Sequence, residues 1–175
     1  AGLVNIDVTP ELALHVAQSL GSLLPSKSHV VVSRDSCGAA RMVKRAIAAG
    51  LNSTGCHVRD LRVASPAVTR FTTRDTRAMG GVHICAADGD PQSIEMHFYD
   101  AEGIDVSTGQ EKKIERLYFR KEFRRAFYDE VGEILYPPRA LEYYTTGLTT
   151  ALNNGGHTKR RYTAVVHMGL SPASF

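Results

Sequence analysis

The feature that most constrains this chain is a repeated alternation of short apolar strands with amphipathic helices. Residues 9–11 combine a capping threonine with Pro10, which is typical of a helix start, and apolar residues then repeat at helical spacing through residue 23. Residues 29–33 form a short β-branched run that predicts a buried parallel strand, and residues 39–51 repeat the helical pattern. Because parallel strands need crossover connections of this kind, the sequence predicts an α/β fold.

The alternation of strands and helices continues along the chain. Residues 57–64 alternate as a strand, a helix begins at Ser65-Pro66, and residues 81–86 predict a further buried strand. Residues 93–100 alternate as a half-exposed strand does, and with the turn at residues 101–103 they predict an edge hairpin.

Two more amphipathic helices are predicted towards the C-terminal end. One spans residues 108–127, and its aromatic residues are interpreted as core because they recur at helical spacing: Tyr118, Phe119, Phe123 and Phe127. The other follows Pro137-Pro138 and carries Leu141, Tyr144, Leu148 and Leu152. Residues 1–152 are therefore predicted to form one domain, residues 153–161 a linker, and residues 162–175 the first strand of a truncated second domain.

Composition excludes several classes of protein. The apolar run at residues 78–87 falls far short of the roughly 20 apolar residues of a membrane-spanning helix. Cys37, Cys56 and Cys85 show no Cys-x-x-Cys spacing, so we interpret them as reduced structural thiols rather than as a disulfide or zinc framework. We expect a soluble cytoplasmic protein.

Basic residues are concentrated in the predicted 108–127 helix, where glutamates are interleaved with them. We interpret this run as a solvated helix face. One alternative is a nucleic-acid-binding module that uses Arg116, Arg120, Arg124 and Arg125, and such a module would show strongly salt-dependent binding.

Two loops that follow predicted strands carry the polar residues expected of a ligand site, because ligands of such sheets bind beyond the carboxyl ends of the strands. In residues 33–38, Arg34 and Ser36 could hold a phosphate beside a helix start. An alternative interpretation pairs Arg34 with Asp35 and makes Ser36 a helix cap.

The second loop, residues 80–91, leaves a buried strand and turns through Gly89. Asp88 and Asp90 are weak candidates for a metal site. His83 and His97 are interpreted as strand-face histidines, because no third ligand stands at metal spacing from them.

This second loop, Gly-Gly-Val-His-Ile-Cys-Ala-Ala-Asp-Gly-Asp, resembles the active-site loop of the alpha-D-phosphohexomutases, the phosphoglucomutase and phosphomannomutase family, whose pattern is Gly-Gly-Val-x-Ile-Thr-Ala-Ser-His-Asn-Pro. The match keeps its register through Phe98, Asp100 and Gly103. Residues 32–36 also resemble the family's Gly-Arg-Asp-Thr-Arg strand end. The resemblance implies domain I of such a protein, a three-layer α/β/α sandwich with a mixed, mostly parallel sheet.

In the family, the loop serine carries the phosphoryl group while Mg²⁺ neutralises charge. The family loop maps here to Cys85, Ala86, Ala87, Asp88 and Gly89, so Ala87 replaces the serine and Asp88 the histidine. His97 stands where the family has a lysine after Gly-Ile. An alanine has no oxygen to phosphorylate, and the resemblance therefore implies a degenerate module.

We expect such a module to act as a scaffold or hexose-phosphate sensor within a larger sugar-phosphate protein. Its partners would be missing downstream domains or a nucleotidyltransferase domain, since it resembles modules fused to mannose-1-phosphate guanylyltransferase-like proteins, or a second copy of itself. The alternative is an active phosphohexomutase, which would use Mg²⁺ in the full-length protein, whereas this chain alone is expected to hold no cofactor.

Overall fold

The structure is a computed structural model that describes residues 1–154 and 163–166. Its helices are α1 (Pro10–Leu23), α2 (Gly38–Ser53), α3 (Pro66–Asp75), α4 (Thr108–Arg120) and α5 (Ala140–Asn154). Its strands are β1 (Gly2–Leu3), β2 (His29–Arg34), β3 (His57–Val63), β4 (Gly80–Ala87), β5 (Asp90–Tyr99) and β6 (Ile134–Leu135).

The strands form one sheet in the order β1-β5-β4-β2-β3-β6. The β2 strand pairs in parallel with both β3 and β4, and β3 pairs in parallel with β6. The β4–β5 and β5–β1 pairs are antiparallel. The sheet is therefore mixed and mostly parallel, as the sequence predicted.

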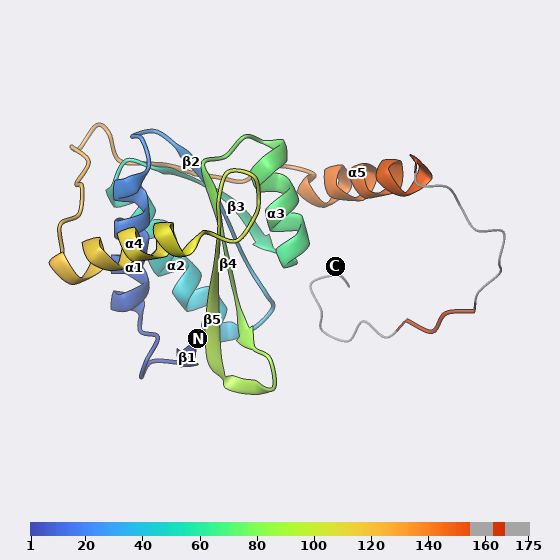
Figure 1. Ribbon diagram of the computed structural model, residues 1–175, viewed down its shortest axis with the longest axis horizontal. Helices are drawn as coiled ribbons and strands as arrows, with labels where there is room; N and C mark the ends of the chain where they lie inside the picture. The colour runs from blue at the N-terminus through green and yellow to red at the C-terminus, as the bar shows by residue number, and fades with distance from the viewer. Residues whose placement is uncertain (155–162, 167–175) are drawn as a thin grey trace.

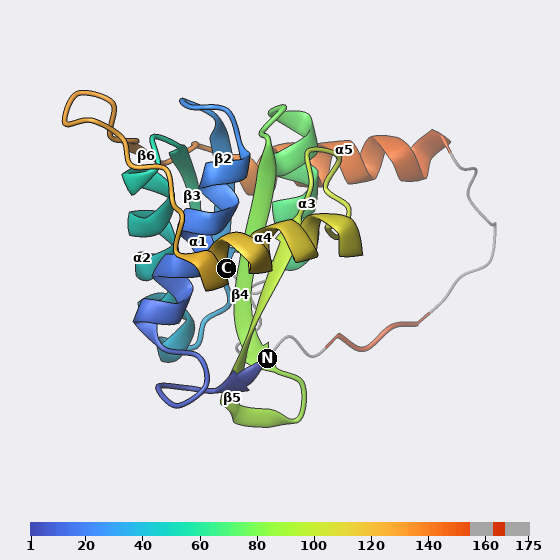
Figure 2. The same cartoon turned by 60° about the vertical axis from the view of Figure 1, so that its left-hand side comes forward.

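Helices cover both faces of this sheet (Figures 1 and 2). On one face, α1 packs on α2 and α4 packs on α1, whereas α3 and α5 lie on the other face. The core between the sheet and the α1–α2 layer is built from fully buried aliphatic side chains, which include Val30, Val32, Val43, Ile47, Leu51, Val58, Val82, Ile84 and Ile94. The predicted three-layer α/β/α arrangement is confirmed.

A capping residue stands directly before each of the first three helices. The Thr9 hydroxyl accepts a hydrogen bond from the Leu12 N–H, and Ser65 caps α3 in the same way from Val68. At the start of α2, the capping group is the Cys37 sulfur, which accepts from the Ala40 N–H. Each cap satisfies a backbone N–H that has no partner within the helix. Because Cys37 caps α2, the interpretation of Ser36 as that cap is wrong.

The predicted strand and its turn at residues 101–103 are present. Residues 93–99 belong to β5, and beyond the turn the chain folds back antiparallel, with a bridge between Tyr99 and Asp105. The main partner of β5 is the preceding strand β4, reached through a tight turn at Asp88-Gly89, and β1 lies on its other side. Gly103, at φ +73°, passes so close to Arg70 that a Cβ would lie 2.4 Å from its carbonyl oxygen.

The helix predicted over residues 108–127 ends earlier, at Arg120, where Lys121 takes a left-handed conformation at φ +54°. The chain then runs back across the ends of α1 and α2, where the Arg124 guanidinium donates to backbone carbonyls of both helices. Tertiary hydrogen bonds thus outweigh the helical pattern beyond residue 120. The short strand β6 further along this segment has no counterpart in the prediction.

Several aromatic and apolar residues predicted as core are exposed. Phe119 and Phe127 are 78% and 75% exposed, and Phe127 lies beyond the end of α4. On α5, Leu141, Leu148 and Leu152 are also exposed, and the main contact of this helix is with α3, where Phe71 packs against Tyr144.

The predicted domain boundary at residue 152 falls inside α5, which continues to Asn154. Most of the predicted linker and second-domain strand lies outside the described residues. The four described residues there, 163–166, belong to no helix or strand, so the prediction of a second domain stays a prediction. No helix in the described part of the chain combines the length and apolarity needed to cross a bilayer.

Candidate functional site

The two loops singled out in the sequence meet at the carboxyl ends of β2 and β4. These strands are parallel neighbours in which Arg34 pairs with Ile84, so the residues that follow them lie side by side. The Asp35 carboxylate joins the loops, since one oxygen accepts the Cys37 N–H and the other the Ala86 N–H, each at 2.8 Å. The two loops therefore lie side by side and are linked by hydrogen bonds.

Ala87 ends β4 at the start of the second loop. It pairs with Asp90 across a turn of only two residues, and Gly89 in that turn has φ +77°, a conformation that favours glycine. The backbone here is a tight hairpin, and the side chain that it presents at residue 87 is a half-buried methyl group. Neither Ala87 nor Ala86 offers an oxygen or sulfur nucleophile.

Cys85, two residues before Ala87, carries a nucleophilic side chain that is half-buried. Burial raises the pKa of its thiol to about 11, with further increases from the negative charges of Asp35, Glu95 and Asp88. Because the thiolate is the reactive form, this environment keeps Cys85 protonated and a poor nucleophile at neutral pH.

His83 and His97 are direct cross-strand partners in the β4–β5 ladder. His83 is buried, its Nδ1 lies 2.7 Å from the Ser33 hydroxyl, and burial lowers its pKa to about 4. His97 is half-exposed, and its Nε2 lies 3.2 Å from a Glu95 carboxylate oxygen. The expectation that no third ligand lies near these histidines is wrong, because Cys85 and Glu95 bring ligand atoms close to His97.

The two phosphate-binding candidates differ in their surroundings. Ser36 lies exposed in the loop before α2. The Arg34 side chain is buried, donates to the Asp35 backbone carbonyl and lines a pocket of about 700 Å³ between α2 and the β3–β6 edge. The Asp35 carboxylate binds backbone N–H groups rather than the Arg34 guanidinium. Whether either residue holds a phosphate stays a prediction.

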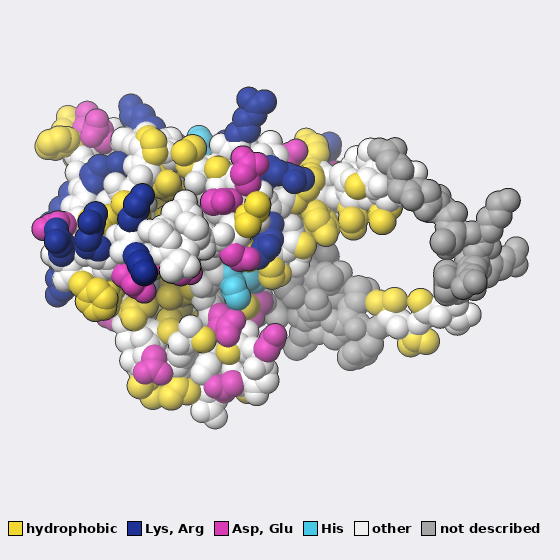
Figure 3. All heavy atoms as spheres, viewed as in Figure 1, with side chains coloured by type: hydrophobic (Ala, Val, Ile, Leu, Met, Phe, Trp, Pro, Cys, Tyr) yellow, Lys and Arg dark blue, Asp and Glu magenta, His cyan; other side chains and the backbone are white. Residues whose placement is uncertain are grey.

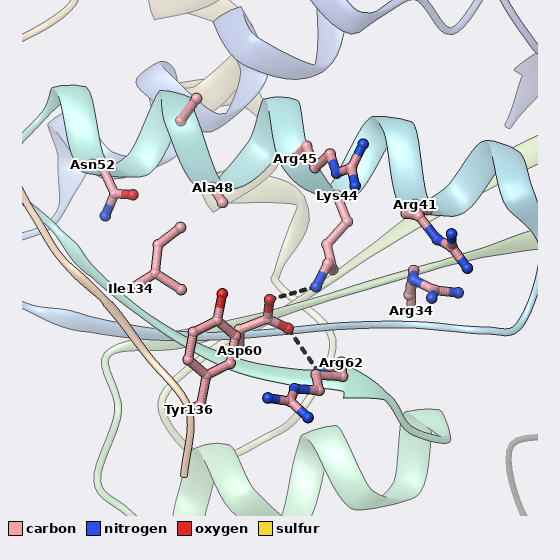
Figure 4. A pocket seen from close by; sticks show the side chains of 11 residues that line it. Arg34, Arg41, Lys44, Arg45, Ala48, Asn52, Asp60, Arg62, Ile134 and Tyr136 are labelled. Atoms are coloured by element: carbon pink, nitrogen blue, oxygen red, sulfur yellow. Dashed lines mark hydrogen bonds and ion pairs between the residues drawn. The ribbon is translucent and has the colours of Figure 1, made fainter.

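Basic side chains dominate this pocket (Figure 4). Its charged lining consists of one carboxylate, Asp60, and five cations, Arg34, Arg41, Lys44, Arg45 and Arg62. Such an excess of positive charge around a concave surface favours an anionic ligand. Ile134 and Tyr136 of the β6 segment supply an apolar wall opposite α2.

Asp60 organises the cations around it. One of its carboxylate oxygens forms an ion pair with Lys44 at 2.5 Å, and the other accepts the Arg62 N–H at 2.7 Å. Arg62 has φ +63° at an irregularity in the β2–β3 ladder, and its guanidinium lies over the Tyr136 ring, 5.1 Å from the ring centre. Non-glycine residues seldom hold this conformation, and irregularities of this kind re-aim side chains beside binding sites.

Sequence reasoning missed this pocket, except for Arg34. The polar face of α2 was visible as Arg41, Lys44 and Arg45 at helical spacing. Nothing in the sequence indicated that Arg62 and Tyr136 lie opposite that face, because the pairing of β3 with β6 is set only in the folded chain.

Asp88 and Asp90 lie exposed on the hairpin turn. The Asp90 carboxylate accepts hydrogen bonds from the Gln92 N–H and the Ser93 hydroxyl, and the Ser93 bond contributes most to lowering its pKa. Among residues 1–154 and 163–166, neither aspartate belongs to a group of three convergent metal ligands. Two exposed, separately engaged carboxylates are a poor match for the Mg²⁺ that the family resemblance implies, so no chemical step is assigned to that ion.

The basic residues of the 108–127 segment do not share one face. Figure 3 shows Lys and Arg side chains gathered over the α4 side of the molecule. Arg124, however, turns inwards, and its guanidinium donates to the carbonyls of Gly21, Leu24 and Thr54. One of the four arginines proposed for nucleic-acid contact is therefore engaged within the protein.

Residues 1–125 match the family model described as phosphoglucomutase/phosphomannomutase, alpha/beta/alpha domain I. The chain is 33% identical over 137 residues to the phosphoglucomutase/phosphomannomutase of Thermococcus kodakarensis, covering 76% of this chain and 30% of that protein. It is 30% identical over 167 residues to a probable phosphoglucosamine mutase of Pyrococcus furiosus, covering 95% and 36%.

Among solved structures, a putative phosphomannomutase from Thermus thermophilus aligns with a TM-score of 0.71 and 26% identity, covering 86% of this chain and 34% of that one. The chain thus spans about a third of the length of these relatives. The fold, the paired loops at the carboxyl ends of β2 and β4 and these matches agree that the chain belongs to the phosphoglucomutase/phosphomannomutase domain I family.

Proposed function

We propose that this chain is a catalytically degenerate phosphohexomutase domain I that binds a phosphosugar without transferring its phosphoryl group. The observation that carries this proposal is Ala87, which stands where the family pattern has its phosphoryl-carrying serine. Phosphoryl exchange through a covalent intermediate needs an oxygen at this position, and a methyl group cannot supply one.

The surroundings of Ala87 support the same conclusion. The tight Asp88-Gly89 turn holds the chain as a hairpin, and Asp88 and His97 replace two further polar residues of the family pattern. The nearby Cys85 is not a substitute carrier, because its raised pKa keeps the thiol protonated.

The basic pocket supports a binding role. A sugar phosphate would place its phosphate among Arg34, Arg41 and Arg45, whose guanidinium groups suit bidentate contacts with phosphate oxygens. The module would then sense a hexose phosphate, or serve as a scaffold, within a larger cytoplasmic protein of sugar-phosphate metabolism. Downstream mutase-like domains or a nucleotidyltransferase domain are the partners that we propose.

The alternative is an active mutase, and it is favoured by the names of relatives at 30–33% identity. A coupled phosphoglucomutase and phosphomannomutase assay of the intact protein, primed with hexose bisphosphate, separates the two. We expect no turnover, and none after Ala87→Ser, because the other loop positions are also altered. Turnover by the unaltered protein would refute degeneracy.

Binding is tested separately by calorimetric titration with glucose 6-phosphate and mannose 1-phosphate. The double variant Arg41→Gln/Arg45→Gln removes two charged donors from the pocket and should weaken binding by at least about tenfold, since one hydrogen bond to a charged group contributes about 1.5–3 kcal/mol. Arg125→Gln, an exposed arginine outside the pocket, is the matched control and should bind as the unaltered protein does. Equal affinity of all three proteins would rule out this pocket as the phosphosugar site.

A further inference from the structure

Three side chains with metal-binding atoms converge on one face of the β4–β5 hairpin. Cys85 and Glu95 are direct cross-strand partners, and His97 lies two residues beyond Glu95 on the same strand. Side chains two residues apart share a face of a strand, so the ladder register alone places all three together. The sulfur, a carboxylate oxygen and an imidazole nitrogen all lie within 4.8 Å of one another.

This face is separate from the core. The neighbouring residues Ile94, Met96 and Phe98 point to the opposite face, where they pack with the core beneath α1 and α4. Cys85, Glu95 and His97 are each half-buried, and the side chains of Glu95 and His97 are 34% and 40% exposed to solvent. The three ligand atoms are thus held in place by the sheet while solvent can still reach them.

We propose that Cys85, Glu95 and His97 form a Zn²⁺ site in which three protein ligands leave a fourth position to water or to an exogenous ligand. Thiolate, imidazole and carboxylate are the ligand types that Zn²⁺ takes in proteins, and three protein ligands with one open position is the arrangement of zinc sites that bind exchangeable molecules.

The distances suit this ion. In a tetrahedral site with bonds of about 2.0–2.1 Å to nitrogen and oxygen, those two ligand atoms lie about 3.3 Å apart. The His97 Nε2 and the Glu95 Oε2 are already 3.2 Å apart. The Cys85 sulfur lies within 4.8 Å of both atoms, on the strand that pairs directly with theirs.

The charges also balance. Zn²⁺ binding displaces the thiol proton of Cys85 to solvent, and the resulting thiolate with the Glu95 carboxylate neutralises the two positive charges of the ion. Acidic side chains surround the lower, hairpin end of the molecule in Figure 3, and the charges of Asp35 and Asp88 act on Cys85. A thiolate ligand disfavours Mg²⁺ and Ca²⁺, which prefer oxygen.

Cys85 and His97 both stand where the phosphohexomutase pattern has other residues, threonine and lysine. Two of the departures from the mutase pattern therefore supply two of the three ligands. This inference does not depend on the phosphosugar pocket, which lies at the opposite edge of the sheet, between α2 and β6.

The test is a Co²⁺ titration of the intact, untagged protein, followed by displacement with Zn²⁺ and by competition against a chromophoric chelator. A 1:1 complex with a thiolate-to-cobalt charge-transfer band in the near ultraviolet is expected. Cys85→Ser should abolish this band and raise the Zn²⁺ dissociation constant by at least about 100-fold, the upper end of what even an outer-shell change costs.

Two further variants complete the design. Cys37→Ser keeps an N-cap oxygen at the start of α2 and should retain both the band and the affinity. His97→Gln, at a half-exposed position that tolerates the change, should weaken Zn²⁺ as Cys85→Ser does. The proposal is overturned if the unaltered protein forms no 1:1 complex, if Cys85→Ser or His97→Gln binds Zn²⁺ as tightly as the unaltered protein, or if Cys37→Ser removes the band.

Discussion

Arg124 offers the sharpest test of how the α1–α2 layer is held together. Its guanidinium donates three hydrogen bonds, at 2.6–2.8 Å, to the carbonyls of Gly21, Leu24 and Thr54 at the C-terminal ends of α1 and α2. A positive charge at these ends also complements the helix dipoles. The change Arg124→Lys keeps the charge but replaces a planar fork by a single ammonium group.

The expected loss follows from this geometry. A lysine ammonium can reach one of the three carbonyls, so two hydrogen bonds from a charged donor are lost. Each contributes about 1.5–3 kcal/mol, and partial solvent access at this site places the total near the lower end, about 3 kcal/mol of unfolding free energy. For a chain of this length, that corresponds to a fall in melting temperature of about 6–12 °C.

Thermal and urea unfolding followed by circular dichroism at the helix band measure this loss, since the chain has no tryptophan for fluorescence. The matched control is Arg125→Lys, the same substitution at the adjacent exposed arginine, which should change stability by less than about 0.5 kcal/mol. If the two variants were equally stable, the reasoning that Arg124 joins the two helices would be refuted.

Three further changes probe the packing, the buried histidine and a helix cap. Gly50→Ala should destabilise the fold by about 1–3 kcal/mol in urea unfolding, because the new Cβ would lie 2.5 Å from the Leu14 carbonyl oxygen, whereas Gly38→Ala, with no atom within 4 Å, should be neutral. Burial, with a smaller contribution from a nearby histidine, lowers the pKa of His83 from 6.5 to about 4, so the unfolded chain takes up this proton first as the pH falls. Stability should therefore decrease by about 3 kcal/mol between pH 6.5 and pH 4, and His83→Gln should flatten this part of the stability profile. Ser107→Ala removes the hydroxyl of the capping box at the start of α4 and should cost about 1 kcal/mol, measurable as a lower urea midpoint with an unchanged slope.

Local signals predicted most of the elements correctly. The caps at Thr9 and Ser65, the β-branched run of β2 and the alternation in β5 each specify their element through interactions within a few residues. The predictions failed where distant residues intervene. The helix over residues 108–127 ends at Arg120 because the segment beyond it runs across the ends of α1 and α2.

The candidate sites divide in the same way. Ala87 and the altered loop around it were evident from the residue pattern, and the meeting of the two loops followed from the parallel strands that carry them. The pocket cations and the Cys85, Glu95 and His97 group were not evident, since each gathers residues from separate elements.

The sequence by itself determined the α/β class, the family resemblance and the absence of a serine at residue 87, because these depend on residue identity, short-range periodicity and chain order. Only the tertiary structure decided which side chains face one another. The β4–β5 register places Cys85 beside Glu95, and the pairing of β3 with β6 places Tyr136 opposite the cations of α2. Register is a property of two strands together, and a shift of one residue would turn each of these side chains to the other face of the sheet.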